Sequence, residues 1–153
     1  MERAIKIFLR LAISSSFLSA VADRFGMWSK DVSVWGNWDN FLSYTQVINP
    51  WAPNALMPFL GIVSTAAEIL FAFCLIIGFR TELFAKLSGI LLLLFGVAMA
   101  SSTGIKGPLD FSVFSASAGA FALSLFKEKF YEVDTLLSKD KNLRWYLDPL
   151  SKS

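Results

Sequence analysis

The chain has 153 residues, of which 55% are hydrophobic and only 17% are charged, and its mean hydropathy is +0.55. Soluble domains carry about a quarter charged residues, so this composition favours a membrane protein, and a formal net charge of +2 is too small to indicate nucleic-acid binding. With no histidine and a single cysteine, the sequence excludes a histidine-ligated haem, an intrachain disulfide and a Cys-x-x-Cys redox pair, and no metal site is expected.

Four apolar segments are long enough to cross a bilayer, which takes roughly 20 residues of helix. They lie at about 4–25, 56–79, 83–102 and 108–126. None alternates with a period of two, so we predict an all-α bundle of four transmembrane helices rather than a β-barrel. Ala20-Val21-Ala22 also resembles a signal-peptidase site, but Arg10 and the serines at 14–16 interrupt the apolar region, which favours a span.

The outer loop, residues 26–54, contains four of the five tryptophans. Val34, Trp38 and Phe41 fall at helical spacing, which predicts a short helix at the membrane surface that ends before Pro50. The aromatic residues are typical of an interfacial collar. Two other interpretations stay open: a docking face for a partner, and a lid over a flat apolar ligand such as a quinone ring, formed by Trp35, Trp38 or Tyr44.

The distribution of basic residues predicts the orientation of the chain in the membrane. Ten of them lie in the N-terminal tail, the 80–86 turn and the C-terminal tail, against three on the opposite side. The positive-inside rule therefore predicts a multi-pass protein of the inner (plasma) membrane with both termini in the cytoplasm. The tail, residues 127–153, alternates charged and apolar residues, which is typical of an amphipathic segment on the cytoplasmic surface.

Two charged residues lie inside the predicted spans. Glu68 is about 15 Å and Arg10 about 10 Å from the cytoplasmic ends of their helices at helical rise. Because charges in lipid face the bundle interior and find partners, we predict an Arg10–Glu68 pair, with Ser15, Ser64 or Thr65 contributing. This pair is interpreted either as a structural clamp or as a proton-handling, ligand-orienting group.

A second polar layer is predicted at the outer end, where Asp23 and Arg24 close the first span and Asp110 opens the fourth. Asp110 is interpreted either as a first-turn cap or as a partner of Arg24 above a cavity. Small residues, among them Gly96 and Ser117, predict close packing between the third and fourth spans.

The segments "FLRLAISSSFLSAVADRFG" and "AAEILFAFCLIIGFRTELFAKLSGILLLLFGVAM" resemble the DoxX-like family of small four-helix membrane proteins. The resemblance covers roughly residues 6–126, and Arg10 and Glu68 occupy positions that match the family pattern. It implies a membrane subunit of a quinone-linked oxidoreductase or of a redox-stress complex. The cysteine pairs of the topologically similar vitamin K epoxide reductases are missing, so thiol–disulfide chemistry is not expected.

These observations give one leading hypothesis, in which the chain binds a quinone-like ligand between the first two spans with Arg10 and Glu68 as the polar floor. No cofactor is bound covalently, and a redox partner protein supplies the flavin or haem. The alternative is a non-catalytic membrane anchor, assembly factor or cargo-binding protein, alone or as a homo-oligomer, with a purely structural ion pair. A small transporter or proton path is a third hypothesis. The bilayer, not nucleic acid, is the common partner of all three.

Overall fold

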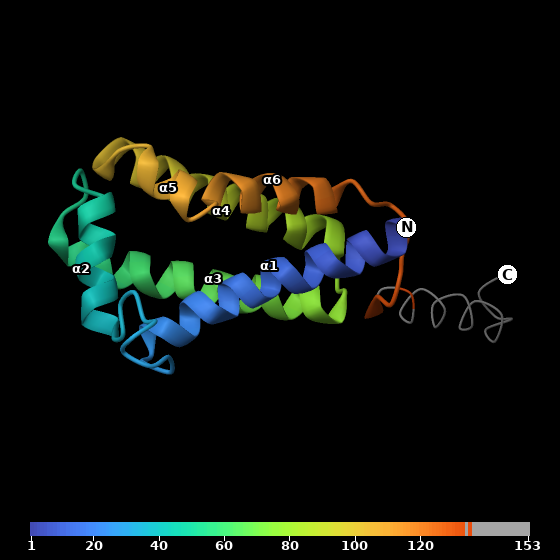
Figure 1. Ribbon diagram of the computed structural model, residues 1–153, viewed down its shortest axis with the longest axis horizontal. Helices are drawn as coiled ribbons and strands as arrows, with labels where there is room; N and C mark the ends of the chain where they lie inside the picture. Colours follow the sequence, from blue (N-terminus) through green and yellow to red (C-terminus); the bar gives the residue numbers. More distant parts are fainter. Residues whose placement is uncertain (134, 136–153) are drawn as a thin grey trace, which may run out of the picture.

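The computed structural model describes residues 1–133 and 135, and within these the chain is helical without any strand (Figure 1). The elements, in chain order, are α1 (Glu2–Arg24), α2 (Trp38–Ile48), the 3-10 turn η1 (Asn54–Leu56), α3 (Met57–Ile77), α4 (Thr81–Thr103), α5 (Lys106–Asp110) and α6 (Val113–Ser124).

Three of the helical segments in the described chain are long and apolar enough to cross a membrane. They are α1 with 23 residues, the continuous run of η1 and α3 with 24, and α4 with 23. About two thirds of each apolar window lies outside the protein interior, where it can contact lipid. These helices match the predicted spans at 4–25, 56–79 and 83–102, and they indicate an integral membrane protein.

The predicted fourth span at 108–126 is wrong as a single helix, because the chain breaks between α5 and α6. Ser112 adopts a left-handed backbone with φ of 56° at the break. The 12 residues of α6 rise about 18 Å, which is short of a bilayer core about 30 Å thick. Four complete transmembrane helices are therefore not found in the described residues.

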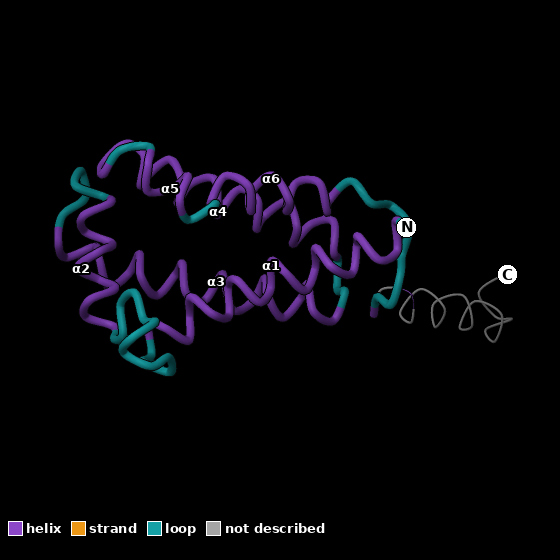
Figure 2. The backbone as a smooth tube through the Cα atoms, viewed as in Figure 1, coloured by secondary structure: helices purple, strands orange, loops and turns teal. Residues whose placement is uncertain are grey.

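The helices form two packed pairs, α1 against α3 and α4 against α6, and α2 lies across the end remote from the N-terminus (Figures 1 and 2). Glycines let α4 and α6 approach closely, since a Cβ on Gly96 would lie 2.7 Å from the Phe114 ring and one on Gly89 would lie 2.9 Å from Phe121. The Ser117 hydroxyl donates to the Gly89 carbonyl at 2.8 Å. The predicted close packing of small residues is confirmed here.

The predicted short helix in the outer loop is confirmed as α2. Asn37 caps its N-terminus by accepting a hydrogen bond from the Asn40 amide at 2.8 Å. Its apolar side rests on α3 at Gly61, where a Cβ would lie 2.6 Å from Leu42 Cδ2. This contact places the aromatic residues of α2 next to the C-terminal end of α1 and the N-terminal end of α3.

The opposite end of the bundle carries the N-terminus, the α3–α4 turn and the segment that follows α6 (Figure 1). We call residues 126–132 the strap, because they run back across the start of α1. The predicted amphipathic tail at 127–153 lies outside the described residues except for 127–133 and 135.

Candidate functional site

A deeply buried ion pair joins α1 to α3 at the end of the bundle that α2 covers. Arg24 Nη2 lies 2.7 Å from Glu68 Oε1, and Arg24 Nη1 donates to the Thr65 hydroxyl at 2.7 Å. The side chains of Arg24 and Glu68 are only 3% and 1% exposed. We call Arg24, Thr65 and Glu68 the outer polar centre, after the predicted outer loop that lies beside them. The sequence predicted a paired Glu68 and a contribution from Thr65.

The predicted partner of Glu68 is wrong, because Arg10 does not reach it. Ser14 lies opposite Ala72 in the antiparallel α1–α3 pair, with a 3.1 Å hydrogen bond to its carbonyl. That register puts Arg10 about eight residues, or roughly 12 Å, from the level of Glu68. Side chains on a helix also lean toward its N-terminus, so Arg10 leans away from Glu68 while Glu68 and Arg24 lean toward each other.

Aromatic rings from the outer loop and α2 cover the Arg24 guanidinium. Its Cζ lies 4.1 Å from the Phe41 ring centroid and 5.4 Å from that of Trp35. Trp35 in turn packs edge-on against Phe41, with centroids 5.3 Å apart. Cation–π contacts of this kind are strongest where water is excluded. We call Trp35, Phe41 and Tyr44 the aromatic lid.

Two of the aromatic residues predicted to cover a ligand take different positions. Tyr44 lies beside Trp35, with ring centroids 5.9 Å apart, and burial raises the pKa of its hydroxyl, so it remains a neutral phenol. Trp38 stacks on Phe25 at 6.0 Å and contacts Phe41 at the edge of the cluster. Of the three predicted covering residues, the structure therefore places only Trp35 against Arg24. Tyr44 and Trp38 each lie one ring away, Tyr44 behind Trp35 and Trp38 behind Phe41.

Asp23 fixes the position of the lid. One carboxylate oxygen accepts hydrogen bonds from the backbone N–H groups of Val34 and Trp35, each at 2.9 Å, and the other accepts from the Ser33 hydroxyl. Asp23 is buried, so these bonds hold the loop tightly against the end of α1. The residue before Arg24 thus holds the tryptophan that covers Arg24.

Asp110 does not belong to this centre. It ends the short helix α5 instead of opening a long one, and its exposed carboxylate pairs with Lys106 one turn earlier. Both predictions for Asp110, as a first-turn cap and as a partner of Arg24, are therefore wrong. The break between α5 and α6 explains this, because it moves the start of the packed helix past Asp110.

Three polar atoms in this centre and its aromatic lid are buried without a hydrogen-bond partner among the described protein atoms: Arg24 Nε, Trp35 Nε1 and Glu68 Oε2. The first two are donors and the third is an acceptor when ionised. Buried polar groups are almost always satisfied, so three together indicate a place where a small polar group can bind. Chemically, the centre can donate to a carbonyl oxygen and accept from a hydroxyl.

Arg10 has a different role at the other end of the bundle. Its guanidinium donates to four backbone carbonyls: Leu75 at 2.8 Å, Ile76 at 2.9 Å, Phe130 at 3.0 Å and Tyr131 at 3.2 Å. It thereby caps the C-terminal turn of α3 and holds the strap. The sequence did not indicate this, because backbone acceptors leave no residue pattern.

Lys6 completes the attachment of the strap. Its ammonium donates to the carbonyls of Phe126 at 3.2 Å and Glu128 at 2.5 Å, and it lies 2.5 Å from the Glu132 carboxylate. Lys6 is 2% exposed, although its place in the sequence predicted only a positive charge of the N-terminal tail. Its spacing of four from Arg10, on one helical face, was the available signal.

No family model, curated protein or solved structure matches this chain. Its function must therefore be inferred from its own residues.

Proposed function

We propose that this protein is the membrane partner of a quinone-linked redox system, and that it binds the polar head of a quinone-like lipid at the outer polar centre. The observation that carries the proposal is the group of three unpartnered polar atoms, Arg24 Nε, Trp35 Nε1 and Glu68 Oε2, buried beneath aromatic rings. Arg24, and not Arg10 as predicted, is the cationic partner of Glu68 in this site.

The chemistry of the centre suits such a head group. A quinone carbonyl oxygen accepts hydrogen bonds, and the indole and guanidinium N–H groups are two donors without partners. The hydroxyl of the reduced form donates, and Glu68 Oε2 is an acceptor without a partner. The rings of Trp35 and Tyr44 supply flat apolar surfaces that suit an aromatic head group.

Entry of a ligand requires the lid to move, since Arg24 is only 3% exposed beneath it. The lid lies on a loop and on α2, which packs on α3 and α4. Opening it requires the hydrogen bonds that Asp23 accepts from the Val34 and Trp35 amides to break, as local opening of a loop does. The isoprenoid tail of a quinone would remain in the surrounding lipid, and the electrons would be exchanged with a partner protein.

The experiment compares quinone retention by two tryptophan variants. The protein is purified in mild detergent from host membranes, its lipids are extracted, and quinone per protein is compared with that of the bulk membrane. We expect enrichment in the wild type and its loss in Trp35→Phe, which removes the indole N–H and keeps a ring over Arg24. Trp51→Phe is the matched control, because Trp51 is 75% exposed. A wild type without enrichment overturns the proposal.

A second function is favoured by the close packing around the ion pair, with Arg24 enclosed by Phe41, Trp35 and Glu68. In this alternative the protein is a non-catalytic membrane anchor or assembly factor and the pair only holds α1 to α3. It predicts equal quinone content in the wild type, Trp35→Phe and Trp51→Phe. The same extraction therefore separates the two functions without depending on a variant that unfolds.

A further inference from the structure

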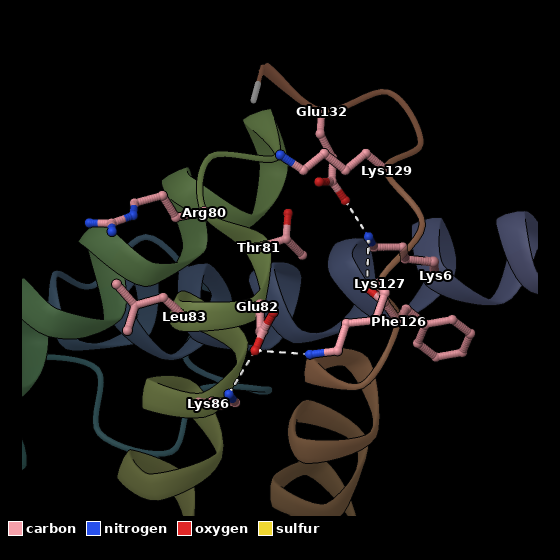
Figure 3. A pocket seen from close by; sticks show the side chains of 10 residues that line it. All are labelled: Lys6, Arg80, Thr81, Glu82, Leu83, Lys86, Phe126, Lys127, Lys129 and Glu132. Atoms are coloured by element: carbon pink, nitrogen blue, oxygen red, sulfur yellow. Dashed lines mark hydrogen bonds and ion pairs between the residues drawn. The ribbon is translucent and has the colours of Figure 1, made fainter. Parts of the chain in front are cut away.

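A second candidate site lies at the opposite end of the bundle, where a pocket of about 360 Å³ opens between the start of α1, the α3–α4 turn and the strap (Figure 3). It is separate from the outer polar centre and plays no part in the quinone proposal. Its walls come from segments far apart in the sequence, which the contacts of Lys6 and Arg10 with the strap bring together.

Basic side chains dominate the lining of the pocket. Five cationic residues line it, against two carboxylates, which leaves an excess of three positive charges. The cationic residues are Lys6, Arg80, Lys86, Lys127 and Lys129. Such a concentration in one concave place favours an anionic ligand.

Both carboxylates are already committed to ion pairs. Glu132 lies 2.5 Å from Lys6, whose ammonium also donates to two strap carbonyls. Glu82 Oε1 lies 2.8 Å from Lys86 and 3.2 Å from Lys127. These pairs leave positive charge in excess, and Lys127 at 72% exposure and the exposed Lys129 can swing toward a ligand.

The floor of the pocket contains an unpartnered polar atom. The Thr81 hydroxyl is buried, lines the pocket and has no hydrogen-bond partner among the described atoms (Figure 3). Thr81 is also the first residue of the 23-residue helix α4, whose N-terminus has no side-chain cap. The first N–H groups of a helix and its dipole favour an anion, and a phosphate oxygen would satisfy the hydroxyl as well.

The level of the pocket along the bundle indicates the kind of anion. It lies where α3 ends at Ile77 and α4 begins at Thr81, which is where membrane-long helices meet the headgroup region. Leu83, 40% exposed, gives the lining an apolar edge next to the charges. A ligand with a phosphate group and an acyl chain matches both features.

We propose that this pocket binds the phosphate group of an anionic phospholipid, with Lys127 and Lys129 as mobile counter-charges and Thr81 as its buried hydrogen-bond donor. Basic pockets at helix ends on the cytoplasmic side are known to take such headgroups. Headgroup binding would tie the strap to the membrane surface at the start of the tail.

The test is native mass spectrometry of the full-length protein in neutral detergent, titrated with phosphatidylglycerol, with phosphatidylcholine and with inorganic phosphate. We expect one phosphatidylglycerol to bind at least about ten-fold more tightly than phosphatidylcholine, whose choline cancels the charge. Each lysine near an anionic lipid headgroup raises the binding affinity about five-fold. The double variant Lys127→Ala/Lys129→Ala should therefore bind phosphatidylglycerol on the order of 25-fold more weakly than the wild type. Thr81→Val should lower the affinity for phosphatidylglycerol several-fold.

The matched control is Lys30→Ala/Lys106→Ala, which makes the same change in net charge using exposed lysines at the other end of the bundle. It should bind phosphatidylglycerol like the wild type. Equal weakening in both double variants overturns the proposal, as does a wild type without headgroup preference. If inorganic phosphate bound as tightly as phosphatidylglycerol, the site would be assigned to a soluble phosphate compound. That result would overturn the proposal that the ligand is a lipid. Melting temperatures confirm that each variant is folded.

Discussion

The two ends of α1 each bury an arginine, and they satisfy it in different ways. Arg24, at the end that α2 covers, has a carboxylate, a hydroxyl and two aromatic rings around it. Arg10 at the other end has four backbone carbonyls, two from α3 and two from the strap. A buried guanidinium needs acceptors for its N–H groups, and these need not include an anion.

The difference has a functional consequence. At Arg10 the three donor nitrogens all have partners in the protein, so the Arg10 side chain itself is a structural joint and is not part of a ligand site. At Arg24 one nitrogen, one carboxylate oxygen and one indole N–H have none among the described residues. The surroundings of Arg24 therefore have unused hydrogen-bonding capacity that a ligand can use, and the following predictions test this contrast between the two arginines.

The largest effect is expected for Arg24→Leu, which leaves Glu68 buried without its cationic partner. Breaking a buried ion pair costs about 3–5 kcal/mol of unfolding free energy. Thermal unfolding in detergent should show a large fall in Tm. The double variant Arg24→Leu/Glu68→Leu should recover most of it, because no charge is then left unpaired. A double variant as unstable as the single one would contradict this account.

Arg10→Leu should cost less, about 1.5–3 kcal/mol, because carbonyls at a helix end can turn to interfacial water. Its effect should be local. Hydrogen exchange and limited proteolysis should increase in the strap, while the fluorescence of Trp35 stays unchanged. If Arg10→Leu disturbed the aromatic lid as strongly as Arg24→Leu does, the two ends would not be independent.

Phe41→Leu tests the cation–π contact with Arg24, whose Cζ lies 4.1 Å from the ring centroid. Such contacts contribute about 0.5–2 kcal/mol, depending on their desolvation. We expect a moderate fall in Tm together with faster hydrogen exchange in α2. Phe59→Leu is the control, since Phe59 is 63% exposed and lies on the outer surface of α3. Equal losses in both variants would assign the effect to apolar area alone.

The smallest effect is expected for Lys106→Ala. Its pair with Asp110 is exposed at both residues and lies one turn apart on α5, so water screens it. The Tm should not change measurably, although the variant removes an ion pair just as Arg24→Leu does. A resolvable fall would mean that α5 holds the α4–α6 pair in place through this contact.

Much of the fold could be predicted from the sequence, because hydropathy and length report directly on membrane helices. The spans containing Arg10, Glu68 and Lys86 are found where they were expected. The prediction of a fourth span was wrong because Phe111 and Ser112 lie in an apolar stretch whose composition is compatible with a continuous helix. The left-handed backbone conformation of Ser112 breaks the helix, and hydropathy does not report on backbone conformation.

The candidate site was predicted in part. Glu68 needs a buried partner in lipid, and this physical requirement holds. Counting depth from the helix ends selected Arg10 over Arg24, since it ignored the direction in which side chains lean on antiparallel helices. Trp35 was identified as a cover, but the role of Asp23 in holding it depends on loop hydrogen bonds with no periodic pattern.

The strap contacts also set an order for assembly during synthesis. Lys6 and Arg10 bind carbonyls about 120 residues further along the chain. Among the described residues, these contacts join positions near the two ends of the chain, so they are among the last that the nascent protein can form. A ribosome-bound chain ending before Phe126 offers Arg10 only the acceptors of α3. The N-terminal turn of α1 therefore reaches its final environment only after almost the whole described chain has been made.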